Sequence, residues 1–90
     1  MPCDADFTHR FELLRSGLVI VAELEEQVDD DSSPQLGLAR SQLAQAGRKI
    51  SASRFDNMFS KAMGVASSVA VANGEDELAE DALELGGDQQ

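Results

Sequence analysis

Apolar side chains recur every three or four residues through most of this chain, which is the period of an α-helix. Near the N-terminus the main stripe is formed by Phe7, Phe11, Leu14, Leu18 and Val21. A second set widens this stripe beyond one face, namely Leu13, Ile20, Leu24 and Val28. A helix over residues 6–27 would be about 33 Å long, enough to span a domain of this size. The sequence therefore predicts an all-α fold built on this helix.

Turn signals divide the remaining chain into further helices. Three aspartates end the first helix, and Ser33 followed by Pro34 is a typical helix start. A second helix is predicted over residues 33–49. The next apolar stripe is rotated by about 130°, at 100° per residue, so a break is predicted with Ser51 or Ser53 as the next N-cap. The third helix covers residues 53–72, with an inward face formed by Phe55, Met58, Phe59, Ala62, Met63, Ala66 and Val69.

Asn73 and Gly74 form a helix-stop signal, and a short acidic helix is predicted after it. The predicted fold is thus a small helical bundle of three long helices plus a short acidic C-terminal helix. Residues 1–85 form a single helical domain in this interpretation, and residues 86–90 form a disordered tail. A chain of this length buries only about 60–65% of its unfolded surface, which leaves open that dimerisation completes the bundle.

Charge is unevenly distributed along the chain, whose net charge is −10. Residues 1–31 carry nine acidic residues against Arg10 and Arg15, and residues 75–90 carry seven acidic residues and no base. The middle of the chain holds five basic residues and a single acid, Asp56. Three interpretations are open: the acidic arms neutralise the basic middle, the basic middle meets an anionic partner, or the acidic face docks on a basic partner.

Several classes of protein are excluded by composition. The single cysteine, Cys3, cannot form an internal disulfide, and with the single histidine, His9, it cannot supply the four ligands of a structural zinc site. Neither residue has the partners needed for nucleophilic catalysis. No apolar run is close in length to the about 20 residues that a membrane-spanning helix needs, and no signal peptide is visible. We therefore expect a cytoplasmic protein that is not an enzyme, needs no cofactor and does not enter membranes.

The leading functional prediction is an acidic protein-interaction module, such as an adaptor, a chaperone-like protein or an inhibitor. Its predicted apolar contact residues either join two copies in a homodimer or receive a partner's helix; they are Leu18, Ile20, Val21, Leu24, Met58, Phe59 and Met63. Its acidic residues are predicted to steer it toward a protein partner that is basic; they are Glu23, Glu25, Glu26, Asp29, Asp30, Asp31, Glu75, Asp76, Glu77, Glu80 and Asp81.

Residues 43–64 carry a different pattern, which supports an alternative. An alanine-rich helix, Gly47 and two serines precede a helix with aromatic anchors at Phe55 and Phe59, followed by Lys61 and Gly64. This pattern resembles the helix-turn-helix of AraC-type regulators. The resemblance implies a small DNA-binding regulator whose DNA-contacting residues are Arg48, Lys49, Ser53, Arg54, Asn57 and Lys61. Nucleic acid is the less expected partner, because a net charge of −10 repels the phosphate backbone.

Overall fold

Over the residues that it describes, the computed structural model contains four α-helices: α1 (Pro2–Gln27), α2 (Ser33–Ala46), α3 (Ala52–Ala72) and α4 (Asp76–Gly87). A short 3₁₀ turn, η1 (Asp30–Ser32), joins α1 to α2. The structure describes residues 2–48 and 51–87, and the side chains of residues 8–48 and 51–86. No strand occurs in these ranges, so the all-α prediction is confirmed.

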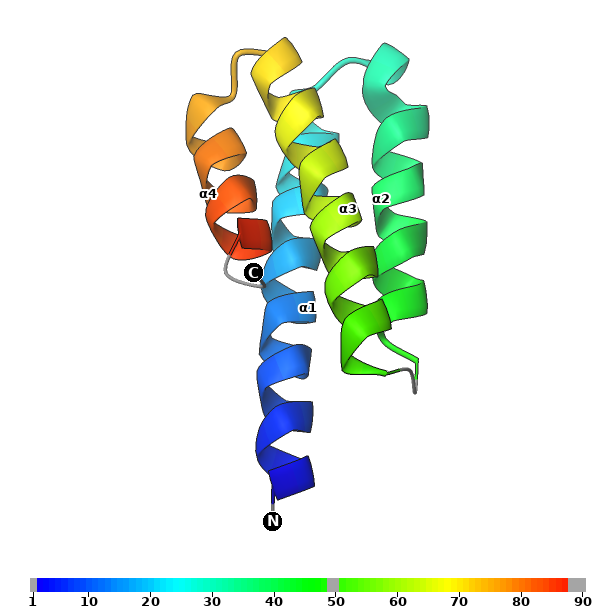
Figure 1. Ribbon diagram of the computed structural model, residues 1–90. Helices are drawn as coiled ribbons and strands as arrows, with labels where there is room; N and C mark the ends of the chain where they lie inside the picture. Colours follow the sequence, from blue (N-terminus) through cyan, green and yellow to red (C-terminus); the bar gives the residue numbers. More distant parts are fainter. Residues whose placement is uncertain (1, 49–50, 88–90) are drawn as a thin grey trace.

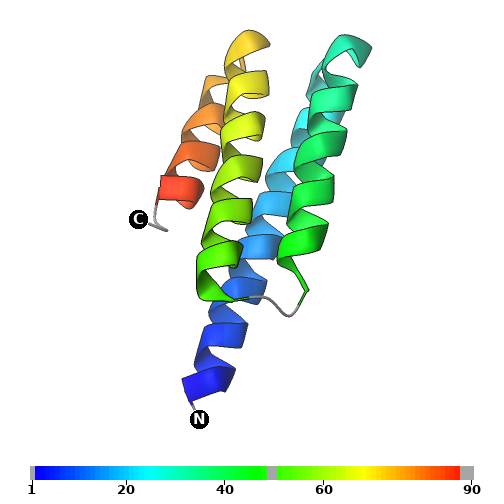
Figure 2. The ribbon, with the colours of Figure 1, turned by 45° about the vertical axis from the view of Figure 1, so that its right-hand side comes forward.

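The helices alternate in direction along one axis and form an elongated bundle (Figures 1 and 2). Helix α3 packs between α2 and α4, and α1 contacts all three of the other helices. The molecule measures 43 × 21 × 18 Å along its principal axes. The first turns of α1 extend beyond the other helices, and the short α4 leaves this end of α1 uncovered on one side (Figure 1).

One hydrophobic core runs along the bundle between the four helices. The predicted inward face of α3 is confirmed except at Met58, which is half-buried. The rings of Phe55 and Phe59 stack at the N-terminal end of this face. The change of phase between the two apolar stripes coincides with the break between α2 and α3, and both stripes point into the same core. The buried residues of this hydrophobic core are Leu13, Ile20, Val21, Leu24, Leu36, Ala39, Leu43, Ala46, Phe55, Phe59, Ala62, Met63, Ala66, Val69, Ala70, Ala79 and Ala82.

The face that α1 turns to the core differs from the main stripe read from the sequence. The buried positions are Leu13, Gly17, Ile20, Val21 and Leu24, whereas the Phe11 side chain is 60% exposed. A Cβ built on Gly17 would lie 3.0 Å from Met63 Cε and 3.3 Å from Phe59 Cε1. The glycine therefore lets α1 approach α3 closely, and this close approach decides which apolar face is buried.

Local capping chemistry sets the ends of α3. Ser51 is the N-cap, and its Oγ accepts a hydrogen bond from the backbone N–H of Arg54 at 3.3 Å. Of the two serines predicted as candidate caps, Ser51 is therefore the one that caps α3. At the other end Asn73 is the C-cap and Gly74 has φ +75°. This is the left-handed conformation that favours glycine, so the stop signal acts as expected from its chemistry.

Two helix ends differ from the predicted boundaries. Helix α2 ends at Ala46, three residues earlier than predicted, because Gly47 forms its C-cap and glycine disfavours helix continuation. Helix α4 continues to Gly87 and so includes two residues that were assigned to the tail. The Ser60 hydroxyl donates a hydrogen bond to the carbonyl oxygen of Gly86 at 3.3 Å, which fixes this end of α4 to α3. Residues 88–90 lie outside the described residues.

Candidate functional site

The seven apolar residues predicted to bind a partner do not form one surface in this structure. Five of them are packed inside the bundle, with at most 8% of each side chain exposed: Ile20, Val21, Leu24, Phe59 and Met63. Four helices enclose these positions within one chain, so they cannot contact a partner unless the helices separate. At these five positions the folded chain therefore presents no accessible docking surface. Leu18 stays 38% exposed and Met58 stays half-buried.

An accessible apolar surface lies instead in a groove between α1 and α2. Its volume is about 600 Å³. The residues that line it are Phe11, Leu14, Arg15, Leu18, Val19, Ala22, Arg40, Leu43, Ala44 and Gly47. On each helix these positions are three or four residues apart, so each helix contributes one continuous face. We call this feature the α1–α2 groove.

The groove exists because α1 is apolar on two faces and the bundle covers only one. The face formed by Phe11, Leu18 and Ala22 is rotated by roughly 140° from the buried face, at 100° per residue. Helix α2 meets it with small residues, Ala44 and Gly47. A Cβ on Gly47 would lie 3.7 Å from Leu14 Cδ1, in ordinary contact. The small side chains leave Phe11, Leu18 and Val19 accessible, with Val19 50% exposed.

Charged side chains flank the groove at both ends. Arg15 lines it toward the N-terminal end of α1. Toward the other end, Arg40 on α2 forms an ion pair with Glu25 on α1. Glu26 is exposed and continues the groove face of α1, because it lies four residues after Ala22. Along the groove face of α1, Arg15 therefore precedes Glu26, and the exposed Glu12 borders the same face seven residues before Val19.

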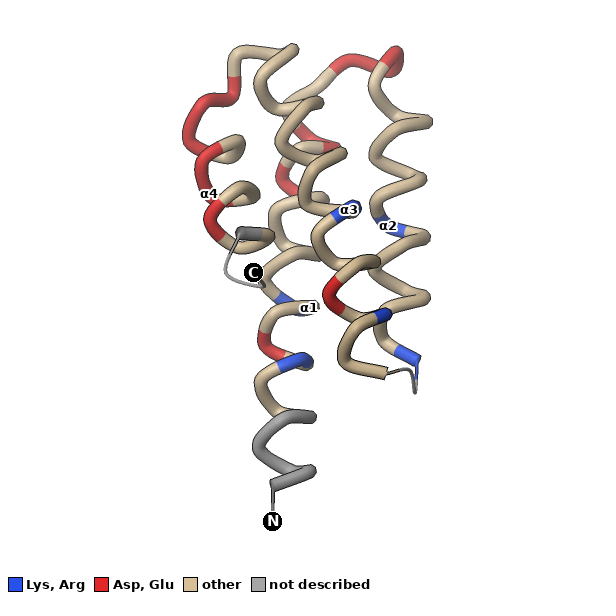
Figure 3. Tube along the Cα trace, viewed as in Figure 1, with Lys and Arg blue, Asp and Glu red and all other residues tan. Residues whose placement is uncertain are grey.

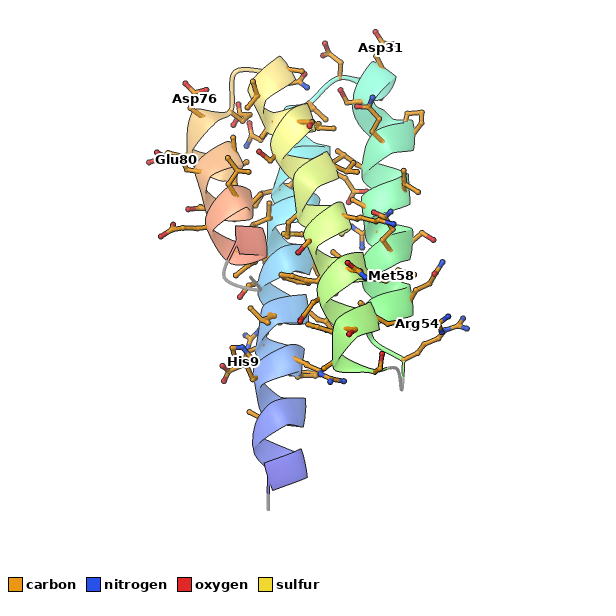
Figure 4. The ribbon with its side chains drawn as sticks, viewed as in Figure 1. His9, Asp31, Arg54, Met58, Asp76 and Glu80 are labelled. Atoms are coloured by element: carbon orange, nitrogen blue, oxygen red, sulfur yellow. The ribbon has the colours of Figure 1, made fainter. Side chains whose placement is uncertain are left out.

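The acidic residues predicted to steer the protein toward a partner lie on the surface. All are exposed except Glu75, which is half-buried. They gather at the end of the bundle that holds the two turns η1 and 73–75, on the C-terminal part of α1, and along α4 (Figure 3). The side chains of Asp31, Asp76 and Glu80 project away from the bundle (Figure 4). Most basic residues lie toward the opposite end, so charge is separated along the long axis (Figure 3).

The structure also places the residues of the alternative DNA-binding interpretation. Arg48, Ser53, Arg54, Asn57 and Lys61 are exposed, and Lys49 lies outside the described residues. Helices α2 and α3 run antiparallel and side by side (Figures 1 and 2). In a DNA-binding helix-turn-helix the two helices cross at about 90–120°. The helix pair that carries the resemblance therefore lacks this docking geometry, and DNA binding stays a prediction without support from the fold.

Sequence reasoning missed most of the groove. Phe11 and Leu14 were assigned to the core stripe, and neither Val19 nor Ala22 was selected as a contact residue. The signal that could have found them was the excess width of the apolar surface of α1. A helix that packs against a bundle on one side can bury only one of its two apolar faces.

Other kinds of site find little support among the described side chains. No three His, Cys, Asp or Glu side chains in this part of the chain come together as a metal site. His9 is exposed on α1 (Figure 4), and the side chain of Cys3 lies outside the described residues. Among the described helices, none combines the length and apolar character that crossing a membrane requires.

Comparison of the chain with protein-family models, with curated proteins and with solved structures finds no match, so its function is inferred from the geometry described above.

Proposed function

We propose that this protein is a non-enzymatic protein-interaction module whose α1–α2 groove receives an amphipathic helix from a protein partner. The observation that carries this proposal is the exposed apolar stripe of α1, with Phe11 60% and Val19 50% exposed over an apolar floor. Exposed large apolar side chains that are contiguous mark interaction sites more often than isolated ones do. A groove between two helices suits a third helix, whose apolar side chains recur at the same spacing.

The chemistry of the groove favours a helix over a small molecule. Pockets for small molecules enclose most of the ligand and aim a few polar groups at it. The α1–α2 groove is instead open along its length, and its floor is formed by apolar side chains such as Leu14, Leu18 and Leu43. Its charged residues, Arg15 and Arg40, are exposed at the edges. Such an arrangement suits a partner helix that buries its apolar face on the floor of the groove and places charged residues at the edges.

The charges around the groove indicate which flanks a partner helix needs. Arg15 at one end favours an acidic flank, and Glu26 at the other favours a basic flank. The acidic residues on α4 and η1 add a long-range field that attracts basic groups and repels nucleic acid. In this proposal the acidic surface increases the rate of association, and the apolar groove supplies most of the affinity.

A display library of amphipathic helical peptides tests the proposal without a known partner. Peptides selected on the wild-type protein should bind in the groove, because that is where an apolar helix face can be buried. Their binding should be lost with Leu18→Asp, which places a charge on the groove floor. Leu38→Asp is the matched control, since Leu38 is 51% exposed on α2 outside the groove. Failure to select any peptide, or equal binding to Leu18→Asp, would contradict the proposal.

A further inference from the structure

We propose that the helix bound in the α1–α2 groove is α1 of a second copy of this chain, in antiparallel orientation, so that two chains form a symmetric homodimer. This inference rests on the proposed function, since it requires that the groove receives a helix, and it names the occupant. Three properties of α1 support it: its exposed stripe, the order of charges along that stripe, and the surface area that the single chain leaves exposed.

The exposed stripe of α1 suits a symmetric contact because it is both the wall of the groove and a helix face of the kind that the groove accepts. In a two-fold symmetric dimer the same patch on each copy contacts itself. Leu18 and Val19 lie in the middle of the stripe, so the two-fold axis is placed beside them. Each copy then lays Phe11, Leu18 and Ala22 into the groove of the other.

The order of charges fits the antiparallel orientation and disfavours the parallel one. With the axis between residues 18 and 19, Arg15 of one copy lies opposite Ala22 of the other copy, one helical turn from its Glu26. Side chains on a helix point toward the N-terminus of that helix. In an antiparallel pair, Arg15 and Glu26 therefore lean toward each other, and symmetry forms this contact twice. A parallel pair would instead place Arg15 beside Arg15 and Glu26 beside Glu26.

The exposed area of the single chain is consistent with a missing partner. The chain exposes 5894 Å², whereas a compact monomer of 9.6 kDa is expected to expose about 5100 Å². The excess is close to the about 800 Å² that one partner contributes to an interface of standard size. Part of this area belongs to the N-terminal turns of α1, which extend beyond the bundle (Figure 1). In the register described above, the partner's α1 would lie along residues 10–27 of this helix, because Gln27 of one copy falls opposite Arg10 of the other.

Sedimentation equilibrium of the full chain over a wide concentration range tests the inference. The expected mass is twice 9.6 kDa. Leu18→Asp should raise the dissociation constant by more than about a hundredfold, because each dimer contains the substitution twice at its centre. Leu38→Asp should leave the dimer unchanged. A wild-type chain that stays monomeric, or a dimer that Leu18→Asp does not weaken, would overturn the inference. Circular dichroism of each variant confirms that its helices are intact.

Charge reversal tests the antiparallel register at exposed residues, where a substitution leaves the packing of the core intact. Arg15→Glu and Glu26→Arg should each raise the dissociation constant by about tenfold, because each creates two like-charge contacts. An equimolar mixture of the two variants should form a heterodimer tighter than either homodimer, since every contact in it joins opposite charges. Glu80→Arg is the control that should not rescue Arg15→Glu, because Glu80 is exposed on α4 and projects away from the bundle (Figure 4). Equal affinities for the mixture and for the separate variants would refute the proposed register.

The peptide selection and the dimer measurement separate this inference from the proposed function. A monomeric protein whose groove still binds selected helical peptides would disprove the homodimer and support the interaction module. A dimer that Leu18→Asp disrupts, and that the selected peptides dissociate, would support both. A monomer that selects no peptides would overturn both.

Discussion

The side-chain amide of Asn73 donates a hydrogen bond to Ser32 Oγ at 3.2 Å, and so joins two turns that are 41 residues apart in the sequence. The same Nδ2 atom also donates to the carbonyl oxygen of Val69 at 2.8 Å. Asn73 therefore caps α3 and holds the α1–α2 connection against the α3–α4 connection. This contact closes the acidic end of the bundle, where like charges would otherwise favour separation of the turns.

Asn73→Ala should lower the free energy of unfolding by about 1–2 kcal/mol, because it removes two partly buried hydrogen bonds. Asn57→Ala is the matched control on the same helix: Asn57 is exposed, and alanine is the better helix former, so stability should hold or rise slightly. Urea denaturation measures both changes. In a double-mutant cycle with Ser32→Ala, the double mutant should lose less stability than the sum of the two single-mutant losses, by about 0.5 kcal/mol or more. Full additivity would show that the contact contributes nothing.

Gly86→Ala should destabilise the protein by about 1–3 kcal/mol through overpacking. A Cβ at this position would fall 2.9 Å from Met63 Cβ, which is too close unless α4 moves away from α3. Gly64→Ala, at an exposed position of α3, should have the opposite effect on stability. No atom lies within 4 Å of its Cβ position, so alanine should stabilise α3 by about 0.5–1 kcal/mol. Thermal unfolding that ranks the two variants in the reverse order would show that α4 does not pack as described.

Two valines on α3 give a direct test of the buried face. Val69 is 1% exposed and Val71 is 62% exposed, although only one residue separates them. Val69→Ala should cost about 1.5–3 kcal/mol of stability through lost burial and an unfilled cavity. Val71→Ala should change stability by less than about 0.5 kcal/mol. Equal effects in urea denaturation would mean that α3 is rotated from the orientation seen here.

Ser51→Ala should cost about 1 kcal/mol, because the first turn of α3 then loses its side-chain cap. Ser53→Ala should be near neutral, since Ser53 is exposed within the helix and is not its cap. Amide hydrogen exchange at the first turn of α3 provides a local measurement. Exchange at Arg54, whose N–H is the donor to Ser51 Oγ, should accelerate in Ser51→Ala and stay unchanged in Ser53→Ala. The reverse result would assign the cap to the other serine.

The elements that could be predicted from the sequence are those that local chemistry controls. Pro34 marks the start of α2, and the signals at Ser51 and Gly74 mark the ends of α3. The phase of α3 could also be predicted, because its apolar residues occupy one face. These features depend on neighbours within a few residues along the chain, so a single sequence contains the information that determines them.

The candidate site was much harder to predict. Leu18 and Val21 belong to the same predicted stripe, yet Val21 is fully buried and Leu18 is partly exposed. The choice between the two apolar faces of α1 depends on its contact with α3 at Gly17 and on how much of α1 the short α4 covers. Both are tertiary properties. Periodicity shows that a helix has two apolar faces, and only the packing of the other helices determines which one remains accessible.

The contact between α4 and α3 has a further consequence for motion. Helix α4 fully buries only small residues, Ala79, Ala82 and Gly86, while Leu78 and Leu85 stay half-buried. The small residues bring the two backbones close but remove little apolar area from water. Such a helix separates from the bundle at a lower free energy than global unfolding requires. Its amides should therefore exchange with solvent as one cooperative unit, ahead of those in α3. Such exchange would indicate a partly unfolded state in which α1, α2 and α3 persist and the Met63 side of α3 is open to water.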